Sequence, residues 1–409
     1  MISVIIPTHE PTYLKETIES VLAQTYKDFE IVLVPTNTVQ LPALPIDKRI
    51  RVVRYHGPSL VGSVKNFAFN QGQGDLLVEL DHDDLLTPDA LDEINNTWQV
   101  TRADFIYSNF ADFIHKTGEP YTFGPYYGWK QRPVETNGRK LIEMHAFDPS
   151  PAALGYIWYA PNHVRVWTKE IYKKIGGHDK TMSICDDHEL LVRTYLTGTM
   201  AKIDKCLYLY RRHDNNTFVQ RNADIQTLTK KIYSMSIEAL VIRWASMNNL
   251  PCYDLGGGFN CPPNWTSVDL HDAKVIADLN KPWPWPDSSV AAFRAFDFFE
   301  HMPNKLHIIK EMYRCLVPGG WVLSLTPSAN GNGFPMDPTH VSPYVKQSFW
   351  YYTNPKFAQY VGNPVKFQEQ RLVEEFPTDW HKTENIPYVT WDAVCLKPGY
   401  DGPGPHEWV

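Results

Sequence analysis

Short apolar runs that end in polar or glycine-rich loops alternate with helical stretches along both halves of this 409-residue chain. Such alternation is typical of α/β domains, in which helices connect the strands of a largely parallel sheet. The first apolar run covers residues 2–6 and stops at Pro7-Thr8, and a second set of runs begins after Pro251. At roughly 150 residues per domain, the length agrees with two or three domains. We therefore expect an α/β fold in two separate domains.

The first half predicts strands and helices whose order places two polar loops at one edge of a sheet. The strands are expected at 2–6, 29–34, 51–55 and 75–80, and the helices at 13–25 and 60–71. Ligands of such sheets bind beyond the carboxyl ends of the strands, where Pro7-Thr8 and residues 81–84 fall. Residues 110–165 are rich in aromatic residues and proline, and predict an irregular region on the acceptor side of a site. Residues 221–249 carry few helix breakers and predict a helical linker.

Composition excludes several classes of protein. With 39 basic and 46 acidic residues the chain carries a net charge of −7, which argues against a general nucleic-acid binder. No stretch approaches the ~20 apolar residues that span a bilayer, so we expect no transmembrane segment, and peripheral contact with a membrane is left open. The first residues lack the basic lead of a signal peptide. Six cysteines without a Cys-x-x-Cys pair predict reduced thiols and a cytoplasmic protein.

Asp81 and Asp83 stand two positions apart at the end of the strand expected at 75–80. Carboxylates at this spacing can share one divalent cation and the ribose of a nucleotide, because Mg²⁺ and Mn²⁺ favour oxygen ligands and bridge to phosphates. The same spacing also fits an acidic cluster that caps the next helix. From the spacing alone, the two interpretations are equally acceptable.

Further motifs stand in a fixed order around this pair. They are the Val-Ile-Ile-Pro-Thr strand at 4–8, Gly-Ser-Val-Lys-Asn at 62–66, the segment 74–84, Ile-Gly-Gly-His-Asp at 175–179, Cys-Asp-Asp-His-Glu-Leu at 185–190, and Tyr-Leu-Tyr-Arg-Arg-His at 208–213. In this order, residues 1–220 resemble the family 2 glycosyltransferases, which have the GT-A fold that binds nucleotide-diphospho-sugars. The resemblance implies a nucleotide-sugar donor and a glycan or glycoconjugate acceptor.

The resemblance also implies roles for individual residues. Those that would bind the donor are Pro7, Thr8 and Glu10 at the base, Lys65 near the diphosphate and Asp81 near the ribose. Those that would hold Mn²⁺ or Mg²⁺ are Asp83 and His213. Asp187, in the Asp186-Asp187 pair, matches the catalytic base; otherwise it is a solvated helix start.

The chemistry of sugar transfer needs groups of these kinds. A sugar nucleotide releases a diphosphate whose growing negative charge a metal and Lys65 can stabilise. The acceptor hydroxyl needs a carboxylate base, and direct displacement would invert the anomeric centre. One departure concerns the strand at 29–34, which runs into Pro35-Thr36-Asn37. Family members usually carry an Asp pair there that reads the base, so the donor nucleotide is left open.

The second half opens with a glycine cluster at the end of a strand, in the order Asp254-Leu255-Gly256-Gly257-Gly258. Glycines there let the backbone approach a ligand closely, and Asp269 at the end of the next strand can bind ribose hydroxyls. A tight turn would look the same. The longer pattern, which runs on through Trp-Pro-Trp-Pro at 283–286 and Phe-Glu-His at 299–301 to Val-Pro-Gly-Gly at 317–320, resembles class I S-adenosylmethionine-dependent methyltransferases with a shortened first helix. This implies a Rossmann-like methyltransferase fold.

That resemblance assigns a second set of residues. Those that would bind S-adenosylmethionine are Asp254, Gly256 and Gly258 around the methionine part, Asp269 at the ribose, and Asp278 and Leu279 at the adenine. Asp297 or His340 would accept the proton of a sugar hydroxyl, and loop hydrogen bonding is the alternative for both. Two late segments, 366–376 and 388–396, predict an antiparallel pair that closes the sheet.

We therefore predict a bifunctional enzyme with a glycosyltransferase domain at 1–220, a helical linker at 221–249 and a methyltransferase domain at 250–409. It would transfer a sugar with inversion and metal dependence, and O-methylate a sugar hydroxyl. Two alternatives remain. In one, the methyltransferase-like half is a non-catalytic binding or scaffold module. In the other, the glycosyltransferase-like half is a glycan-binding module that presents substrate to the methyltransferase.

Overall fold

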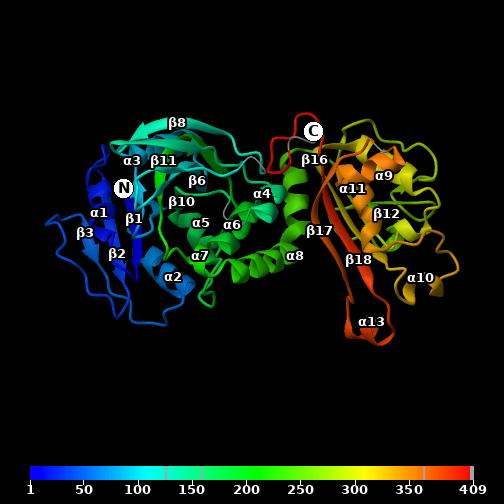
Figure 1. The fold of residues 1–409 in the computed structure, drawn as a ribbon, viewed down its shortest axis with the longest axis horizontal. Coiled ribbons are helices and arrows are strands. Elements are labelled where there is room, and N and C mark those ends of the chain that lie inside the picture. Colours follow the sequence, from blue (N-terminus) through cyan, green and yellow to red (C-terminus); the bar gives the residue numbers. More distant parts are fainter. Residues whose placement is uncertain (125–126, 158–159, 363, 406–409) are drawn as a thin grey trace. The chain divides into compact units, whose positions relative to one another are not determined.

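The structure is a computed structural model that describes residues 1–124, 127–157, 160–362 and 364–405. The chain divides into two compact units, and the division falls between Ser236 and Ile237, inside the long helix α8 (Asn222–Met247). The helical stretch expected at 221–249 is thus a single helix (Figure 1). Both units are α/β, as the alternation of apolar runs and helical stretches predicts.

The first unit is built on a sheet whose first four strands run parallel. Across this sheet the order is β3 (Ile50–Val52), β2 (Phe29–Pro35), β1 (Ile2–Thr8), β4 (Leu76–Glu79), β10 (Arg165–Thr168), β6 (Phe105–Ile114), β11 (Met200–Arg212) and β5 (Leu85–Leu86). Strand β10 runs antiparallel to both of its neighbours. The chain leaves β1 toward β2 and β3 and returns to β4 on the other side. The carboxyl ends of β1 and β4 therefore bound a crevice at a topological switch point, where ligands bind in sheets of this kind.

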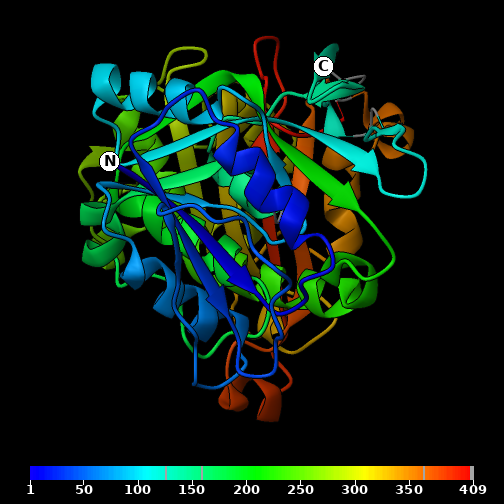
Figure 2. The same ribbon diagram turned by 90° about the vertical axis from the view of Figure 1, so that its left-hand side faces the viewer.

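Helices and smaller strands complete the first unit. They are α1 (Leu14–Leu22), α2 (Val61–Gln71), α3 (Ala90–Thr101), β7 (Pro120–Tyr121), β8 (Gln131–Thr136), β9 (Arg139–Met144), α4 (Pro151–Tyr156), α5 (Lys169–Lys174), α6 (Asp186–Thr197) and α7 (Thr217–Gln220). Figure 2 views this unit from the side of α1, drawn in dark blue. Strands β1 and β2 are buried along nearly their whole length. This explains why their sequences read as continuous apolar runs and not as alternating ones.

The region at 110–165 is more regular than the sequence analysis predicts. Strand β6 covers its beginning, and β8 and β9 form a hairpin that pairs with β6 through β9. The hairpin turns at Asn137 and Gly138, which both have positive φ, 51° and 69°. Asn-Gly is the preferred pair for such a two-residue turn, so this dipeptide was a usable signal. The prediction of an irregular region was wrong at these strands.

The second unit holds another sheet, ordered β14 (Val275–Ile276), β13 (Thr266–Asp269), β12 (Cys252–Leu255), β15 (Val290–Phe296), β16 (Leu316–Pro327), β18 (Tyr388–Cys395) and β17 (Phe367–Glu375). The first five strands are parallel. Strand β18 runs antiparallel to both neighbours, which confirms the closing pair expected at 366–376 and 388–396. The switch point of this sheet lies between β12 and β15, so their carboxyl ends bound the expected ligand crevice.

Short helices surround this second sheet. They are η2 (Gly258–Asn260), η3 (Phe299–His301), α9 (Lys305–Cys315), α10 (Gly333–Met336), η4 (Lys346–Phe349), α11 (Trp350–Thr353), α12 (Pro355–Ala358), η5 (Gln359–Val361) and α13 (Asp379–Thr383). After β12 the chain makes only the 3₁₀ turn η2, which agrees with the shortened first helix. All six cysteines are free. Within the described ranges, no helix combines the length and apolarity that crossing a membrane requires.

Candidate functional site

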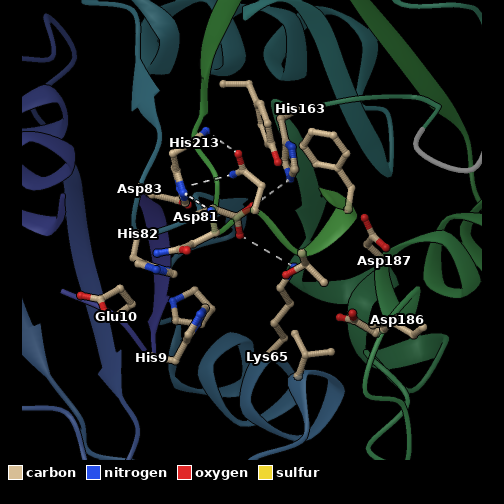
Figure 3. A pocket seen from close by; sticks show the side chains of 18 of the residues that line it. His9, Glu10, Lys65, Asp81, His82, Asp83, His163, Asp186, Asp187 and His213 are labelled. Atoms are coloured by element: carbon tan, nitrogen blue, oxygen red, sulfur yellow. Dashed lines mark hydrogen bonds and ion pairs between the residues drawn. The ribbon is translucent and has the colours of Figure 1, made fainter. Parts of the chain in front are cut away.

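A cavity of about 820 Å³ opens at the carboxyl ends of β1 and β4. Its volume is typical of sites that bind small molecules. Every residue assigned to donor, metal or base in the first half lines this cavity, namely Pro7, Thr8, Glu10, Lys65, Asp81, Asp83, Asp187 and His213. In Figure 3, His9 and Glu10 lie on one side and Asp186 and Asp187 on the other, with Lys65, Asp81 and Asp83 between them.

The acidic loop after β4 is fixed by its last member, Asp84. This carboxylate is fully buried and accepts hydrogen bonds from the Tyr208 hydroxyl and the Arg211 backbone N–H, both at 2.7 Å. The Arg211 guanidinium also donates to the backbone carbonyl of Asp83 at 2.6 Å. Because these contacts attach the loop to β11, the side chains of Asp81 and Asp83 are presented to the cavity from a rigid turn.

Asp83 and His213 lie at the distance of two ligands of one cation. His213 Nε2 is 2.9 Å from Asp83 Oδ2. Burial opposes ionisation of Asp83, but the His213 hydrogen bond and the charge of His82 bring the pKa of this carboxyl below its usual value. One carboxylate and one imidazole suit Mn²⁺ or Mg²⁺ and leave positions for phosphate oxygens and water. The residues present therefore fit a divalent metal.

Lys65 reaches the cavity from helix α2, which packs very closely against the loop that precedes α6. A Cβ atom on Gly62 would lie 1.9 Å from the Asp179 carbonyl oxygen, so a glycine is required there. Lys65 Nζ is 2.6 Å from Glu79 Oε1 and 3.9 Å from Asp81 Oδ1. Burial alone would lower the pKa of Lys65, but the carboxylate of Glu79 reverses this and raises it well above its usual value. Lys65 is thus a fixed positive charge at the cavity floor.

Asp186 and Asp187 begin helix α6, directly after Cys185, whose φ of 57° is unusual for a residue with a side chain. Arg165, itself only 1% exposed, lies 2.6 Å from Asp187 Oδ2. Burial alone would raise the pKa of Asp187, but the charges of Arg165 and Lys65 lower it to about 2. Burial raises the pKa of Asp186 to about 7. The environments of the two neighbouring carboxyls thus move their pKa values in opposite directions, which is a feature of acid–base sites.

Other residues of the cavity escaped the sequence analysis. Glu79 is buried within β4 and lies beside three basic side chains, since His163 Nε2 and Arg165 lie 3.5 and 3.6 Å from its Oε2 and Lys65 contacts its other oxygen. A glutamate inside an apolar strand was a usable signal for this residue. No pattern in the sequence marks His163 or Arg165, because their positions depend on the antiparallel pairing of β10 beside β4.

The side of the cavity expected to bind the nucleobase and the side expected to bind the acceptor have distinct linings. Thr36 and Thr38, which follow β2, line the cavity at the place where the resemblance led us to expect an Asp pair. Glu10 accepts hydrogen bonds from the Thr12 hydroxyl and N–H at 2.6 and 3.0 Å. The aromatic run at 121–129 is divided. Tyr121 and Phe123 line the cavity, Trp129 packs in the core, and residues 125–126 lie outside the described residues.

In the second unit, the glycine loop after β12 bends around Asp254. This residue is 1% exposed and its Oδ1 is 2.9 Å from Arg294, so its carboxylate is part of the structural support of the loop. A Cβ atom on Gly257 would lie 2.3 Å from Asp254 Oδ2. Gly256 and Gly258 have φ of 73° and 43°, which favours glycine at both positions. The loop therefore carries no side chains at 256–258, so a cofactor could approach its backbone closely.

The ribose and adenine candidates lie along the next strands. The space that a Cβ atom of Gly258 would fill lies 3.5 Å from Asp269 Oδ2. Asp278 is held in a turn by Asn280 and Lys281. Leu279 is 5% exposed and packs in the core, so it offers a ligand little side-chain surface. Exposed apolar side chains that the sequence analysis did not single out follow the loop and β13, namely Phe259 at 85% and Leu270 at 51% exposure.

The two candidate bases of the second half lie near Glu300. Asp297 follows β15 with φ of 49°, and it stands beside the hydroxyl of Tyr388. His340 Nε2 is 4.0 Å from Glu300 Oε1. Burial raises the pKa of Glu300 to about 7, and the charge of Asp297 adds to the shift. The structure thus brings Asp297 and His340 to the same buried carboxyl, at the end of the sheet where the glycine loop lies.

Comparisons with known proteins agree with the division of the chain. Residues 3–156 match the family model described as glycosyl transferase family 2, and residues 264–324 match the model described as methyltransferase domain. Glycosyltransferase GlyG of Streptococcus pneumoniae is 23% identical over 224 residues, which cover 53% of this chain and 72% of GlyG. An uncharacterised glycosyltransferase of Rickettsia typhi is 24% identical over 226 residues, and the match covers 53% of this chain and 65% of that protein, just under two thirds.

A third relative is the O-antigen biosynthesis protein RfbC of Myxococcus xanthus, 31% identical over 217 residues, which cover 48% of this chain and 16% of RfbC. Among solved structures, residues 1–349 of S. aureus TarS give a TM-score of 0.40 at 14% identity, with 61% of this chain and 72% of that chain covered. The same TarS fragment in complex with UDP-GlcNAc gives a TM-score of 0.42 at 14% identity, with 60% and 72% covered.

Proposed function

We propose that this chain, which joins a family 2 glycosyl transferase domain to a methyltransferase domain, transfers a sugar from a nucleotide-sugar donor to a glycan acceptor and O-methylates a sugar hydroxyl. The observation that carries the proposal is that eight residues from distant segments, assigned to donor, metal and base, line one cavity. The six free thiols favour a reducing compartment such as the cytoplasm.

In the donor half of the cavity, the base would lie against Pro7, Thr8 and Glu10. Thr36 and Thr38 would offer it hydroxyl groups in place of carboxylates. Asp81 would accept from the ribose, and Lys65 would face the diphosphate. A divalent cation held by Asp83 and His213 would supply positive charge to the leaving diphosphate. Lys65, fixed by Glu79, supplies such charge from the protein itself.

Asp187 is proposed as the base of sugar transfer. The proton of the acceptor hydroxyl passes to Asp187 as the acceptor oxygen forms a bond to the anomeric carbon. The bond from this carbon to the diphosphate breaks on the opposite face, and the configuration inverts. Arg165 keeps Asp187 ionised and orients it before the acceptor binds. Because a carboxyl of low pKa is a weak base, the acceptor would have to weaken the Arg165 ion pair as it binds.

In the second unit, the bare loop at 256–258 and Asp269 fit S-adenosylmethionine, which would supply an electrophilic methyl group. Gly256 and Gly258 would pass beneath its methionine part, and Asp254 supports that loop. Asp269 would bind the ribose, and Asp278 with the backbone of Leu279 would border the adenine. The exposed ring of Phe259 is available to cover a flat ligand. Asp297 or His340 would take the proton of the methylated hydroxyl.

One specific observation favours a second candidate for the first unit, a non-catalytic glycan-binding module. The end of β2 carries no carboxylate to read a base, and Thr36 follows directly. The paired Asp83 and His213 and the buried Asp187–Arg165 pair oppose this candidate.

Calorimetric titration of the full chain with S-adenosylmethionine and with a panel of sugar nucleotides separates these functions. Binding of both ligand classes, followed by mass-spectrometric detection of a glycosylated and then methylated acceptor, is the expected result. Sugar-nucleotide binding without S-adenosylmethionine binding would make the second unit a scaffold. Binding of S-adenosylmethionine and of free glycans, without any sugar nucleotide, would make the first unit a glycan-binding module.

A further inference from the structure

Three potential metal ligands converge after strand β15 of the second unit. Glu300, His301 and His340 each offer one ligand atom, and these atoms lie within 4.8 Å of one another. Glu300 is fully buried, and while its Oε2 accepts the Thr326 hydroxyl at 2.7 Å, its Oε1 has no hydrogen-bond partner. A buried carboxylate oxygen without a partner is costly. A cation bound there would remove that cost.

Hydrogen bonds fix which nitrogen of each histidine is available. His340 Nδ1 lies 2.9 Å from the Phe334 carbonyl oxygen, so it must carry the proton and donate it. The Thr339 hydroxyl donates its only proton to Asp337 at 2.6 Å, so His301 Nδ1, 3.1 Å from that hydroxyl, must also be a donor. In the neutral rings both Nε2 atoms then carry a lone pair. Support of a ligating histidine through its other nitrogen is typical of metal sites.

The surroundings of the cluster are suited to a cation. Asp337 Oδ2 lies 3.8 Å from His340 Nε2, outside the group of three ligand atoms, and adds negative charge beside it. Among the described residues, the structure gives the Glu300 carboxylate no arginine or lysine partner. A second His–carboxylate cluster, at Glu143, His145 and Asp204, differs in this respect, because Arg132 already donates to both oxygens of Glu143, at 2.8 and 3.1 Å.

We infer that Glu300, His301 and His340 form a divalent transition-metal site in the second unit. Two imidazoles with one carboxylate suit Zn²⁺ or Mn²⁺ and leave coordination positions open. Phe298, two residues before Glu300, lies 3.3 Å from where a Cβ atom of Gly256 would stand, so the site adjoins the glycine loop. This part of the inference rests on the proposed function: the open positions would take hydroxyl oxygens of the sugar that accepts the methyl group. His340, protonated at Nδ1 and bound through Nε2, would then leave Asp297 as the base.

Metal binding tests the site without any assay of activity. The full chain carries Asp83→Ala and His213→Ala, so that the metal position proposed for the first unit does not contribute, and is titrated calorimetrically with Zn²⁺ and with Mn²⁺. We expect one metal per chain. Added His301→Ala or His340→Ala should weaken binding more than about 100-fold, since loss of even a supporting residue costs 10–100-fold. His145→Ala, in the cluster blocked by Arg132, is the matched control and should leave the affinity unchanged.

Two further measurements protect the test against misfolding. Bound Zn²⁺ should raise the unfolding midpoint of the Asp83→Ala, His213→Ala chain, and His340→Gln, which keeps side-chain size, should abolish this rise in a protein that still unfolds cooperatively. Absence of stoichiometric metal, or unchanged affinity in both histidine variants, overturns the site. Metal binding that requires His301 and His340 in a chain without methyl transfer would retain the site and refute the methylation. Methyl transfer with no bound metal would refute the metal site and retain the methylation.

Discussion

In the cavity of the first unit, the carboxylates lie beside buried basic side chains. The glycine loop of the second unit, in contrast, would present only backbone atoms to a ligand. Glu79 alone contacts Lys65, His163 and Arg165. By contrast, the one hydrogen bond described for the Asp269 carboxylate is the one that it accepts from the backbone N–H of Leu270. The first site is therefore charged and preorganised before any ligand binds, and a substitution in it should also disturb the neighbouring side chains. Changes at the second should act on the ligand alone.

The largest expected effect is on the base of the first site. Asp187→Asn keeps the shape of the side chain and removes its proton-accepting ability, so turnover of sugar transfer should fall by ~10²–10⁴-fold. Donor affinity should change little. Initial rates and donor titrations measure the two effects separately. Asp186→Asn is the matched comparison, and if it alone abolished turnover while Asp187→Asn stayed active, the base assignment would pass to Asp186.

The next effect concerns the metal position. Asp83→Ala removes the counter-ion support of the diphosphate, which contributes several kcal/mol in metal-assisted reactions, so donor binding should weaken by about 100-fold. In the unaltered chain, EDTA should abolish transfer, and Mn²⁺ or Mg²⁺ should restore it. Both are measured by donor hydrolysis and by calorimetry. Full activity after exhaustive chelation would remove the metal from the mechanism.

A smaller effect, confined to one unit, is expected from Asp269→Ala. Loss of hydrogen bonds to a charged group costs about 1.5–3 kcal/mol, so S-adenosylmethionine should bind roughly 10–100-fold more weakly while sugar transfer continues at its normal rate. Asp272→Asn, an exposed change in the same loop region, serves as the control. Loss of both activities in a folded Asp269→Ala protein would show that the two sites are coupled and would contradict the comparison drawn above.

The smallest effect is a pH dependence of stability. Burial raises the pKa of Asp186 to about 7 from its usual 3.8. Between these values the folded chain binds more protons than the unfolded chain, so this group's contribution to stability is present at low pH and is lost as the pH rises through 7. One proton changes the free energy of unfolding by at most about 1.4 kcal/mol per pH unit. Urea unfolding from pH 5 to 8 should show a flatter profile for Asp186→Asn than for Asp272→Asn.

Several elements were predictable because their signals are local. The apolar runs of β1 and β2, the helix-forming stretch of α8 and the late antiparallel strands all follow from short-range patterns. The motifs also identified eight residues that the fold gathers around one cavity. Strand β6 was missed because it is buried on both faces and lacks the alternation that marks a half-exposed strand.

Local patterns in the sequence were enough to predict two α/β units, the polar loops at their strand ends and the residues that reach those loops. Tertiary structure decided the electrostatic state of those residues. Arg165 meets Asp187 only because β10 is inserted antiparallel between β4 and β6. Glu300 and His340 meet only because the segment after β16 returns to the end of β15, where the backbone N–H of Val341 donates to the Glu300 carbonyl. Charge and pKa depend on distances of a few ångströms across such contacts, which no local pattern encodes.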